Sequence, residues 1–412
     1  MSRIRIKNFG PIKEGYQNED GWIEISKVTV FTGNQGSGKS TVAKLISTFL
    51  WIEKALTRGD YEPKEFTNYS RFRKNYCSYH RLENYFFDLN KNDNAEIEYW
   101  GTSYRIKYDK GTLTINEVKN GYYPLPQIMY VPAERNFISN VKAPKALKLT
   151  SDSLVEFVTE FDNAKDEMKG AMQLPINNVY VEYQKLNDIV YIKGEDYKIK
   201  LTEASSGFQS IVPLYIVSWF LANSVQKQSE ISKGMMSSEE MERFRKGVAE
   251  IWGNDSLTEE QRRIALSVLS SKFNKTAFIN IVEEPEQNLF PTSQQKILNS
   301  LLEFNNMNLD NKLIMTSHSP YLINYLTLAV KANYLKEQIQ KEELRVKLDS
   351  IVPLNSTVKS NDLLIYEMNE RDGSIGKLES YNGLPSDENE LNEMLGESNE
   401  LFAQLLEIQQ SL

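Results

Sequence analysis

A glycine-rich segment near the start of the chain has the composition of a phosphate-binding loop. Residues 33–40 read G-N-Q-G-S-G-K-S, which matches the pattern G-x4-G-K-[ST]. Glycines allow a tight turn in which successive backbone N–H groups surround a β-phosphate, and a following helix adds its positive end. Lys39 would reach the β and γ oxygens, and Ser40 would supply an oxygen to Mg²⁺. We therefore predict that ATP and Mg²⁺ bind here. The residues expected at the nucleotide are Asn34, Gly36, Ser37, Gly38, Lys39, Ser40 and Thr41.

Two consecutive acidic residues follow an apolar run later in the chain. Residues 277–282 are short and apolar apart from Asn280, and Glu283 and Glu284 come directly after them. A nucleotide site of this kind needs an acidic residue near the magnesium ion and a base that polarises the attacking water. We expect Glu283 to act in the magnesium shell and Glu284 to polarise water in line with the γ-phosphate.

The two histidines of the chain stand in different surroundings. His318 lies in the segment T-S-H-S-P, directly after the apolar run 313–315. A histidine at the carboxyl end of a parallel strand lies on the ligand face of a sheet, where it can hydrogen-bond a γ-phosphate or orient water. The alternative is a histidine that caps the next turn. His80 lies in an aromatic and basic segment without such a context, and we expect it on the surface.

The elements that must position these residues point to an α/β fold. An apolar run at 28–31 precedes the glycine-rich loop, and apolar residues at helical spacing follow it from 42 to 46. Residues 277–282 and 313–315 are short enough to be buried parallel strands, residues 128–131 predict a short apolar strand, and alternating residues at 96–115 predict a small antiparallel sheet. We expect one domain over 1–412 with an N-terminal mixed sheet and a central parallel sheet flanked by helices. The additions expected on it are a helical insertion at 51–92, a helical hairpin insertion at 225–275, and a strand and helices at 360–412.

Composition excludes several classes of protein. The chain has 412 residues, 40% of them hydrophobic, and a formal net charge of −8, so as a whole it does not attract nucleic acid. Its single cysteine, Cys77, cannot form an internal disulfide, and two histidines are too few for a zinc cluster. We find no signal peptide and no run of about 18 apolar residues. A cytoplasmic protein outside the membrane is expected.

A fourth segment completes a recognisable set of motifs. Residues 201–210 contain S-x-G-x-Q with Ser205 and Gly207, and the order of the glycine loop, this signature, E-E-P-E and T-S-H-S-P resembles the ABC-type ATPases of the Rad50, SMC, RecF and overcoming-lysogenization-defect branch. The resemblance implies an ATP-sandwich dimer or larger oligomer in which Ser205 and Gly207 contact the γ-phosphate bound to the opposite subunit. It also implies that residues 286–289 form the D-loop at the dimer interface. The family usually has Asp at the position of Glu283.

The opening residues 6–12, the V-P-A-E-R-N stretch at 131–136 and the close at 383–391 resemble the ATPase subunits of bacterial anti-phage systems, among them that of the PARIS system. This resemblance implies a sensor and scaffold that holds a separate effector, a toprim-type nuclease, until a phage-encoded trigger protein is sensed. The alternative is a RecF- or Rad50-like DNA-repair or chromosome-maintenance ATPase. That function needs a DNA-binding track, for which the candidates are Arg71, Arg73 and Lys74 with Tyr69, Tyr76 and Tyr79, and Lys142, Lys145 and Lys148. A transporter ATPase is disfavoured by the long interval between the signature and Glu283.

Overall fold

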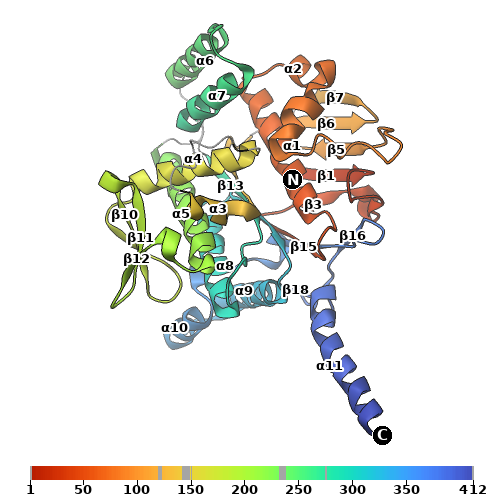
Figure 1. Cartoon of the computed structure of the whole chain (residues 1–412), viewed down its shortest axis with the longest axis vertical. Coiled ribbons are helices and arrows are strands. Elements are labelled where there is room, and N and C mark those ends of the chain that lie inside the picture. Colours follow the sequence, from red (N-terminus) through yellow and green to blue (C-terminus); the bar gives the residue numbers. More distant parts are fainter. Residues whose placement is uncertain are drawn as a thin grey trace.

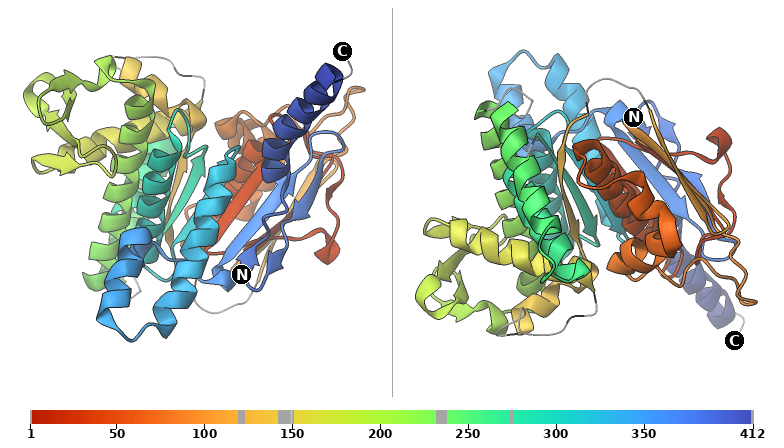
Figure 2. Two further views of the ribbon diagram at one scale, coloured as in Figure 1. Left: turned by 90° about the horizontal axis from the view of Figure 1, so that it is seen from below. Right: turned by 90° about the horizontal axis from the view of Figure 1, so that it is seen from above.

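The computed structural model describes residues 2–118, 123–141, 149, 151–231, 238–273 and 276–410 of the chain. A central sheet carries helix α1 (Lys39–Arg58) and a second sheet on one face, and a group of helices on the other face (Figure 1). Figure 2 shows these layers edge-on, with α1 between the two sheets. The α/β class predicted from the sequence is confirmed.

Seven strands form the central sheet, in the order β2-β16-β15-β4-β14-β13-β8. They are β2 (Gly15–Tyr16), β16 (Ser374–Lys377), β15 (Leu363–Met368), β4 (Val28–Gly33), β14 (Lys312–Ser317), β13 (Ala277–Glu283) and β8 (Pro126–Val131). The strands from β15 to β8 are parallel, and β4 and β13 are buried along their whole length because both faces of the sheet are covered. Asn280 fits inside β13 because its Nδ2 donates a hydrogen bond to Ser218 Oγ at 2.9 Å.

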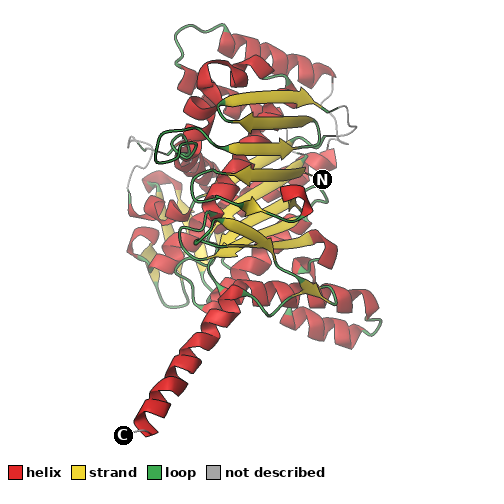
Figure 3. Ribbon diagram, turned by 90° about the vertical axis from the view of Figure 1, so that its right-hand side faces the viewer, coloured by secondary structure: helices red, strands yellow, loops and turns green. Residues whose placement is uncertain are grey.

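The second sheet is built from the N-terminal part of the chain, in the order β3-β1-β5-β6-β7. Its strands are β3 (Ile23–Ile25), β1 (Ser2–Lys7), β5 (Glu96–Trp100), β6 (Tyr104–Asp109) and β7 (Thr112–Glu117). Figure 3 shows the strands of this sheet lying side by side. Every pairing is antiparallel, whereas a mixed sheet was expected. The physical reason is that β5, β6 and β7 are joined by short turns, and a parallel pair needs a long crossover.

A buried carboxylate fixes this second sheet to α1. Glu53 of α1 accepts hydrogen bonds from Tyr99 Oη at 2.7 Å and from the backbone N of Ser103 at 2.7 Å. Its side chain also fills the space beside Gly101, where a Cβ would lie 2.1 Å from Glu53 Oε1. The contacts hold the β5–β6 turn against the helix that begins at the glycine-rich loop.

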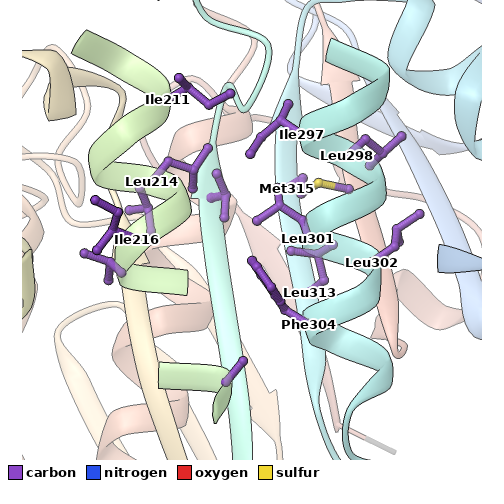
Figure 4. Close-up of a cluster of buried hydrophobic side chains, with 14 of the residues drawn as sticks. Ile211, Leu214, Ile216, Ile297, Leu298, Leu301, Leu302, Phe304, Leu313 and Met315 are labelled. Carbon is purple, nitrogen blue, oxygen red and sulfur yellow. The ribbon is translucent and has the colours of Figure 1, made fainter. Parts of the chain in front are cut away.

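Four helices cover the opposite face of the central sheet: α4 (Asp152–Glu167), α5 (Ser206–Ile231), α8 (Pro291–Asn306) and α9 (Pro320–Gln338). In the cluster drawn in Figure 4, Ile211 and Leu214 of α5 and Leu301 of α8 lie around Leu313 and Met315 of β14. By length and composition alone, Ser206–Gln228 of α5 could cross a membrane, but more than half of its apolar 18-residue window is buried in the protein. Packing against β13, α4 and α8 explains its apolar composition.

The remaining described elements lie around this body. They are the short helices α2 (Pro63–Thr67) and α3 (Phe137–Asn140); the sheet β12-β11-β10-β9, with β9 (Ala171–Gln173), β10 (Tyr180–Gln184), β11 (Ile189–Lys193) and β12 (Lys198–Lys200); the helices α6 (Ser238–Trp252), α7 (Glu259–Phe273) and α10 (Glu342–Ile351); and the pair β17 (Ser380–Tyr381) and β18 (Leu384–Pro385). Helices α6 and α7 pack against each other inside the range expected to hold a helical hairpin.

Helix α11 (Glu390–Gln410) projects away from the rest of the molecule (Figures 1 and 3). Its first turn is held to the central sheet, because the backbone N of Glu390 donates to Glu367 Oε1 of β15 at 3.0 Å. Farther along, large apolar side chains such as Phe402 and Leu405 remain about 60% exposed.

Candidate nucleotide site

Three parallel strands bring the predicted residues to one edge of the central sheet. Strand β4 leads into the glycine-rich loop, β13 ends at Glu283, and β14 ends at Ser317 directly before His318. Ser317 pairs in register with Thr32, and Glu283 pairs with Thr316. The carboxyl ends of all three strands therefore meet, which is where ligands bind in open α/β sheets.

Backbone geometry explains the glycines of the loop. Gly33, Gly36 and Gly38 have φ angles of 132°, 79° and 103°, which residues with a side chain adopt only at a cost. At Gly33 there is a second restriction, because a Cβ would lie 2.2 Å from the carbonyl oxygen of Met368 in the neighbouring strand β15. Gly38 then serves as the N-cap of α1, so the open N–H groups at the start of a 20-residue helix face the loop.

The Lys39 ammonium folds back over this loop. It donates hydrogen bonds to the carbonyl oxygens of Gly33 at 2.8 Å and Asn34 at 2.6 Å. Burial lowers the pKa of Lys39 to about 8, and the nearby Glu284 and Glu286 oppose that shift. A phosphate placed in the loop would give this buried cation a partner of opposite charge.

The other loop residues differ in accessibility. Asn34 and Gly36 are exposed, Ser40 is half-buried, and Ser37 and Thr41 are buried. Asn34 also donates from Nδ2 to Glu370 Oε1 at 3.2 Å. The β15–β16 turn that carries Glu370 therefore lies beside the loop, a proximity between residues about 340 positions apart that no sequence motif signals.

Glu284 and His318 form a pair at this edge. Glu284 Oε1 lies 3.2 Å from His318 Nε2, and both side chains are about one-third exposed. The hydrogen bond from His318 is the main cause that lowers the pKa of Glu284, and the positive charges of Arg135 and Lys39 act in the same direction. Glu284 has a φ of 44°, a left-handed backbone conformation that residues with a side chain adopt only at a cost. The arrangement presents an ionised carboxylate that is oriented by an imidazole.

Glu283 faces inward, and its two oxygens have different surroundings. Its Oε2 accepts a hydrogen bond from the backbone N of Ala133 at 3.0 Å. Its Oε1 is buried without a hydrogen-bond partner among the described residues and lies 4.0 Å from Lys44 Nζ. Lys44 is one helical turn beyond Ser40 on α1, so the serine hydroxyl and this oxygen belong to facing elements. Oxygen donors of this kind fit a magnesium ion.

A third acidic side chain, Glu286, contacts the segment that carries His318. Glu286 Oε1 accepts hydrogen bonds from Ser317 Oγ at 2.8 Å and from the backbone N of His318 at 2.7 Å. Burial raises the pKa of Glu286. Its carboxylate therefore joins the segment expected to form the D-loop to the histidine segment of the same chain, and the expected place of 286–289 at a dimer interface stays a prediction.

Ser205 and Gly207 stand at the start of α5, apart from the loop just described. Ser205 is exposed, and its carbonyl oxygen accepts the first helical hydrogen bond, from Gln209 N at 3.0 Å. The Gln209 side chain folds back to the carbonyl oxygen of Ala204 at 3.1 Å and so fixes the turn before the helix. Gly207 packs on the segment after Glu286, since a Cβ there would lie 2.8 Å from the carbonyl oxygen of Asn288.

A buried arginine that sequence reasoning did not assign lies behind the acidic pair. Arg135 has no exposed surface, and its guanidinium donates to the carbonyl oxygens of Glu283 at 2.6 Å and Glu284 at 2.5 Å. The available signal was its place in the V-P-A-E-R-N stretch after β8, but no motif reveals that an arginine will be fully buried.

His80 is buried, and its expected place on the surface is therefore wrong. Its ring packs 4.6 Å from that of Tyr79 and 4.5 Å from that of Tyr130. Burial lowers its pKa well below the usual value, so a neutral imidazole acts here as an aromatic side chain.

The basic segment considered for DNA is largely committed to internal contacts. Arg71 pairs with Glu65, and the ring of Tyr76 packs 4.6 Å from Phe66. Tyr79 donates to Glu156 through its hydroxyl group. The side chain of Tyr69 and the residues Lys142, Lys145 and Lys148 lie outside what the structure describes. The rings of Tyr76 and Tyr79 are thus not free to stack on bases.

Comparison with known proteins finds similarity among solved structures. No family model matches the chain, and no curated protein sequence matches it. The chain is similar to the SMC head domain from Thermotoga maritima, with 10% identity, coverage of 92% of this chain and 98% of that chain, and a TM-score of 0.37. It is similar at 10% identity to the Smc head domain bound to the C-terminal domain of ScpA, derived from Pyrococcus furiosus (92% and 96% covered, TM-score 0.37). It is also similar at 12% identity to the dimeric ATP-binding cassette MJ0796 bound to ADP and Pi (92% and 100% covered, TM-score 0.26). At these identities and TM-scores the matches carry no information on activity or on individual residues.

Proposed function

We propose that this protein is an ABC-type ATPase that binds and hydrolyses ATP as a dimer and serves as the sensor and scaffold of an anti-phage complex. One observation carries the ATPase assignment. The glycine-rich loop with Lys39, the Glu284–His318 pair and the Glu283 carboxylate lie at the ends of adjacent parallel strands, although they are far apart in the sequence. A phosphate site, a metal ligand and an oriented base are the three parts that phosphoanhydride hydrolysis requires.

The residues would divide the reaction as follows. The N–H groups of the loop and of the start of α1 hold the β-phosphate, and Lys39 exchanges its loop carbonyls for the β and γ oxygens. Glu284, kept ionised by His318, accepts a hydrogen bond from the attacking water and takes its proton as the water oxygen bonds to the γ-phosphorus. The bond from that phosphorus to the β–γ bridging oxygen breaks in the same reaction, and ADP leaves with the bridging oxygen. Mg²⁺ held by Ser40 and Glu283 would neutralise charge on the phosphate oxygens.

The dimer part of the proposal concerns Ser205 and Gly207. They lie at the N-terminus of a long helix, a place suited to an anion, and Ser205 is exposed. In the described part of the chain no hydrogen bond joins either residue to the loop at 33–40. In a dimer, the loop at 33–40 of one subunit would bind the nucleotide, and the α5 N-terminus of the second subunit, with its exposed Ser205, would cover it. The defence role and a separate nuclease-type effector rest on the sequence resemblance of residues 6–12, 131–136 and 383–391.

A mixing experiment tests the ATPase and its dimer together. The Lys39→Ala chain loses the phosphate ligand, and the Ser205→Arg chain carries a bulky cation where the facing phosphate must approach. Because Ser205 is exposed, the second variant should fold normally. We expect neither chain alone to release phosphate, and we expect partial activity to return when they are mixed, since one composite site of the heterodimer is intact.

Two results would contradict this proposal. Lys39→Ala with wild-type turnover would remove the phosphate-site assignment. Subunit exchange, verified by mass, without recovered single-site hydrolysis would remove the role of Ser205 across the interface. The defence role is tested separately, by co-purifying the product of the neighbouring gene with ATP and with ADP and by scoring phage resistance of the Lys39→Ala strain.

A further inference from the structure

Arg135 is an internal cation whose hydrogen bonds, among the described residues, go to backbone oxygens. It lies in the 3₁₀ turn Ala133–Asn136 after β8, and its side chain has no exposed surface. Burial lowers its pKa to about 10, so it remains charged at neutral pH. Its hydrogen bonds go to four carbonyl oxygens: Pro132 at 3.3 Å, Ser210 at 3.2 Å, Glu283 at 2.6 Å and Glu284 at 2.5 Å.

These acceptors belong to three separate segments of the chain. Pro132 directly follows β8, Ser210 lies in the first turns of α5, and Glu283 and Glu284 are the last residue of β13 and the residue after it. A planar guanidinium has five N–H donors in a fixed fork, so it can hold three segments in one geometry, whereas a lysine ammonium can rotate freely. Arg135 therefore sets the distance between the start of α5 and the acidic turn.

Two neighbouring hydrogen bonds reinforce the same connection. Ser210 Oγ donates to Gln287 Oε1 at 3.2 Å, which ties α5 to the segment after Glu284. Ser139 Oγ donates to the carbonyl oxygen of Gln209 at 3.0 Å, which ties α5 to helix α3. The opening of α5, which carries Ser205, and the turn that carries Glu284 are thus joined through Arg135 and its surroundings.

We propose that Arg135 is a positioning residue that couples the two composite ATP sites of the dimer. The inference rests on the proposed function, in which Ser205 of a chain contacts the nucleotide of the opposite subunit while Glu284 of the same chain acts on its own nucleotide. When the facing γ-phosphate docks against the start of α5, the movement is passed through the guanidinium to the carbonyl oxygens of Glu283 and Glu284. Glu284 is placed to polarise the attacking water only after the start of α5 has docked against the nucleotide of the opposite subunit.

The coupling predicts a specific kinetic defect. In Arg135→Lys the charge remains but the fixed fork is lost, so we expect kcat to fall about 100-fold, the effect of a displacement of roughly 1 Å in a catalytic group. KM should change less than about threefold, because the loop that binds phosphate is untouched. The Hill coefficient for ATP should fall from a wild-type value above 1 to 1, since the sites no longer communicate.

The experiment compares Arg135→Lys and Arg135→Ala with the matched control Arg81→Gln. Arg81 is a partly exposed arginine whose side chain pairs with Glu134, the residue directly before Arg135. Steady-state hydrolysis, binding of a fluorescent ATP analogue and thermal unfolding are measured for each. Guanidinium chloride at low millimolar concentration, with NaCl as the ionic control, should restore part of kcat in Arg135→Ala, because the deleted side chain leaves a cavity of the right shape.

The outcomes separate this inference from the function on which it rests. A wild-type protein that binds no ATP or releases no phosphate contradicts the proposed function itself. If the wild type is active, an Arg135→Lys chain with unchanged kcat and Hill coefficient overturns the coupling, as does a non-cooperative wild type. If Arg135→Ala does not fold, the lysine variant decides. A proportional loss of nucleotide binding and activity in the folded lysine variant would assign Arg135 a purely structural role and overturn the proposal.

Discussion

Replacing Glu284 by glutamine tests the catalytic pair most directly. The amide keeps the size and the hydrogen-bonding reach of the carboxylate but cannot take a proton from water. We expect phosphate release to slow by a factor on the order of 10² or more, which corresponds to about 2.7 kcal/mol in the activation barrier. The ATP-bound dimer should accumulate, because binding through the loop at 33–40 is unaffected.

The effect on stability should be far smaller than the effect on rate. The side chains of Glu284 and His318 are 32% and 31% exposed, and a polar contact with that much solvent exposure contributes at most about 1 kcal/mol. The φ of 44° at this position is equally strained for glutamate and glutamine, so the substitution does not change the backbone cost. A glycine at 284 would relieve that strain and serves as a stability control.

Single-turnover phosphate release, with binding and urea unfolding measured on the same samples, separates these effects. Glu283→Gln is the comparison variant. It should lower the affinity for Mg²⁺, so that hydrolysis needs a higher Mg²⁺ concentration. If Glu284→Gln turned over at the wild-type rate while Glu283→Gln alone was slow, the two roles would be reversed. A loss of more than about 2 kcal/mol in unfolding free energy for Glu284→Gln would instead mean that the pair is structural.

Three further predictions concern other parts of the chain. Burial lowers the pKa of Lys39 to about 8, so in the free protein the Lys39 ammonium loses its proton as pH rises. ATP affinity measured by titration should therefore weaken about tenfold between pH 7 and pH 9, and the Lys39→Ala chain should show no such change. Glu53→Ala leaves the hydroxyl of Tyr99 and a backbone N–H without their buried acceptor and should lower the unfolding free energy in urea by about 3 kcal/mol or more, whereas Glu53→Gln should cost less. Phe402→Ser and Leu405→Ser on the projecting helix α11 should each change the unfolding free energy by less than about 0.5 kcal/mol, and a larger loss would show that α11 packs on the body in solution.

Local sequence patterns determined the central elements of this protein. The glycines at 33, 36 and 38 specify a loop whose φ angles favour glycine, and the apolar runs at 28–31, 277–282 and 313–315 became buried parallel strands. Both signals are local, because backbone sterics and the burial of short apolar runs depend on neighbouring residues. The same patterns failed where burial depends on distant segments, as for His80, which lies between tyrosine rings, and for α5, whose apolar surface is covered by several other elements, among them α4, α8 and β13.

Tertiary structure alone decided which side chains meet. The contact of Glu286 with the histidine segment, the contact of Asn34 with Glu370, and the inward direction of the Glu283 carboxylate join residues that are far apart in the sequence. Arg135 is the clearest case, because an arginine in a sequence is expected on the surface and only the simultaneous presence of four carbonyl oxygens from three segments makes its burial favourable. Sequence determines such residues and their spacing along the chain, but a hydrogen bond depends on the distance and direction between two atoms, and the packing of the sheets and helices sets both.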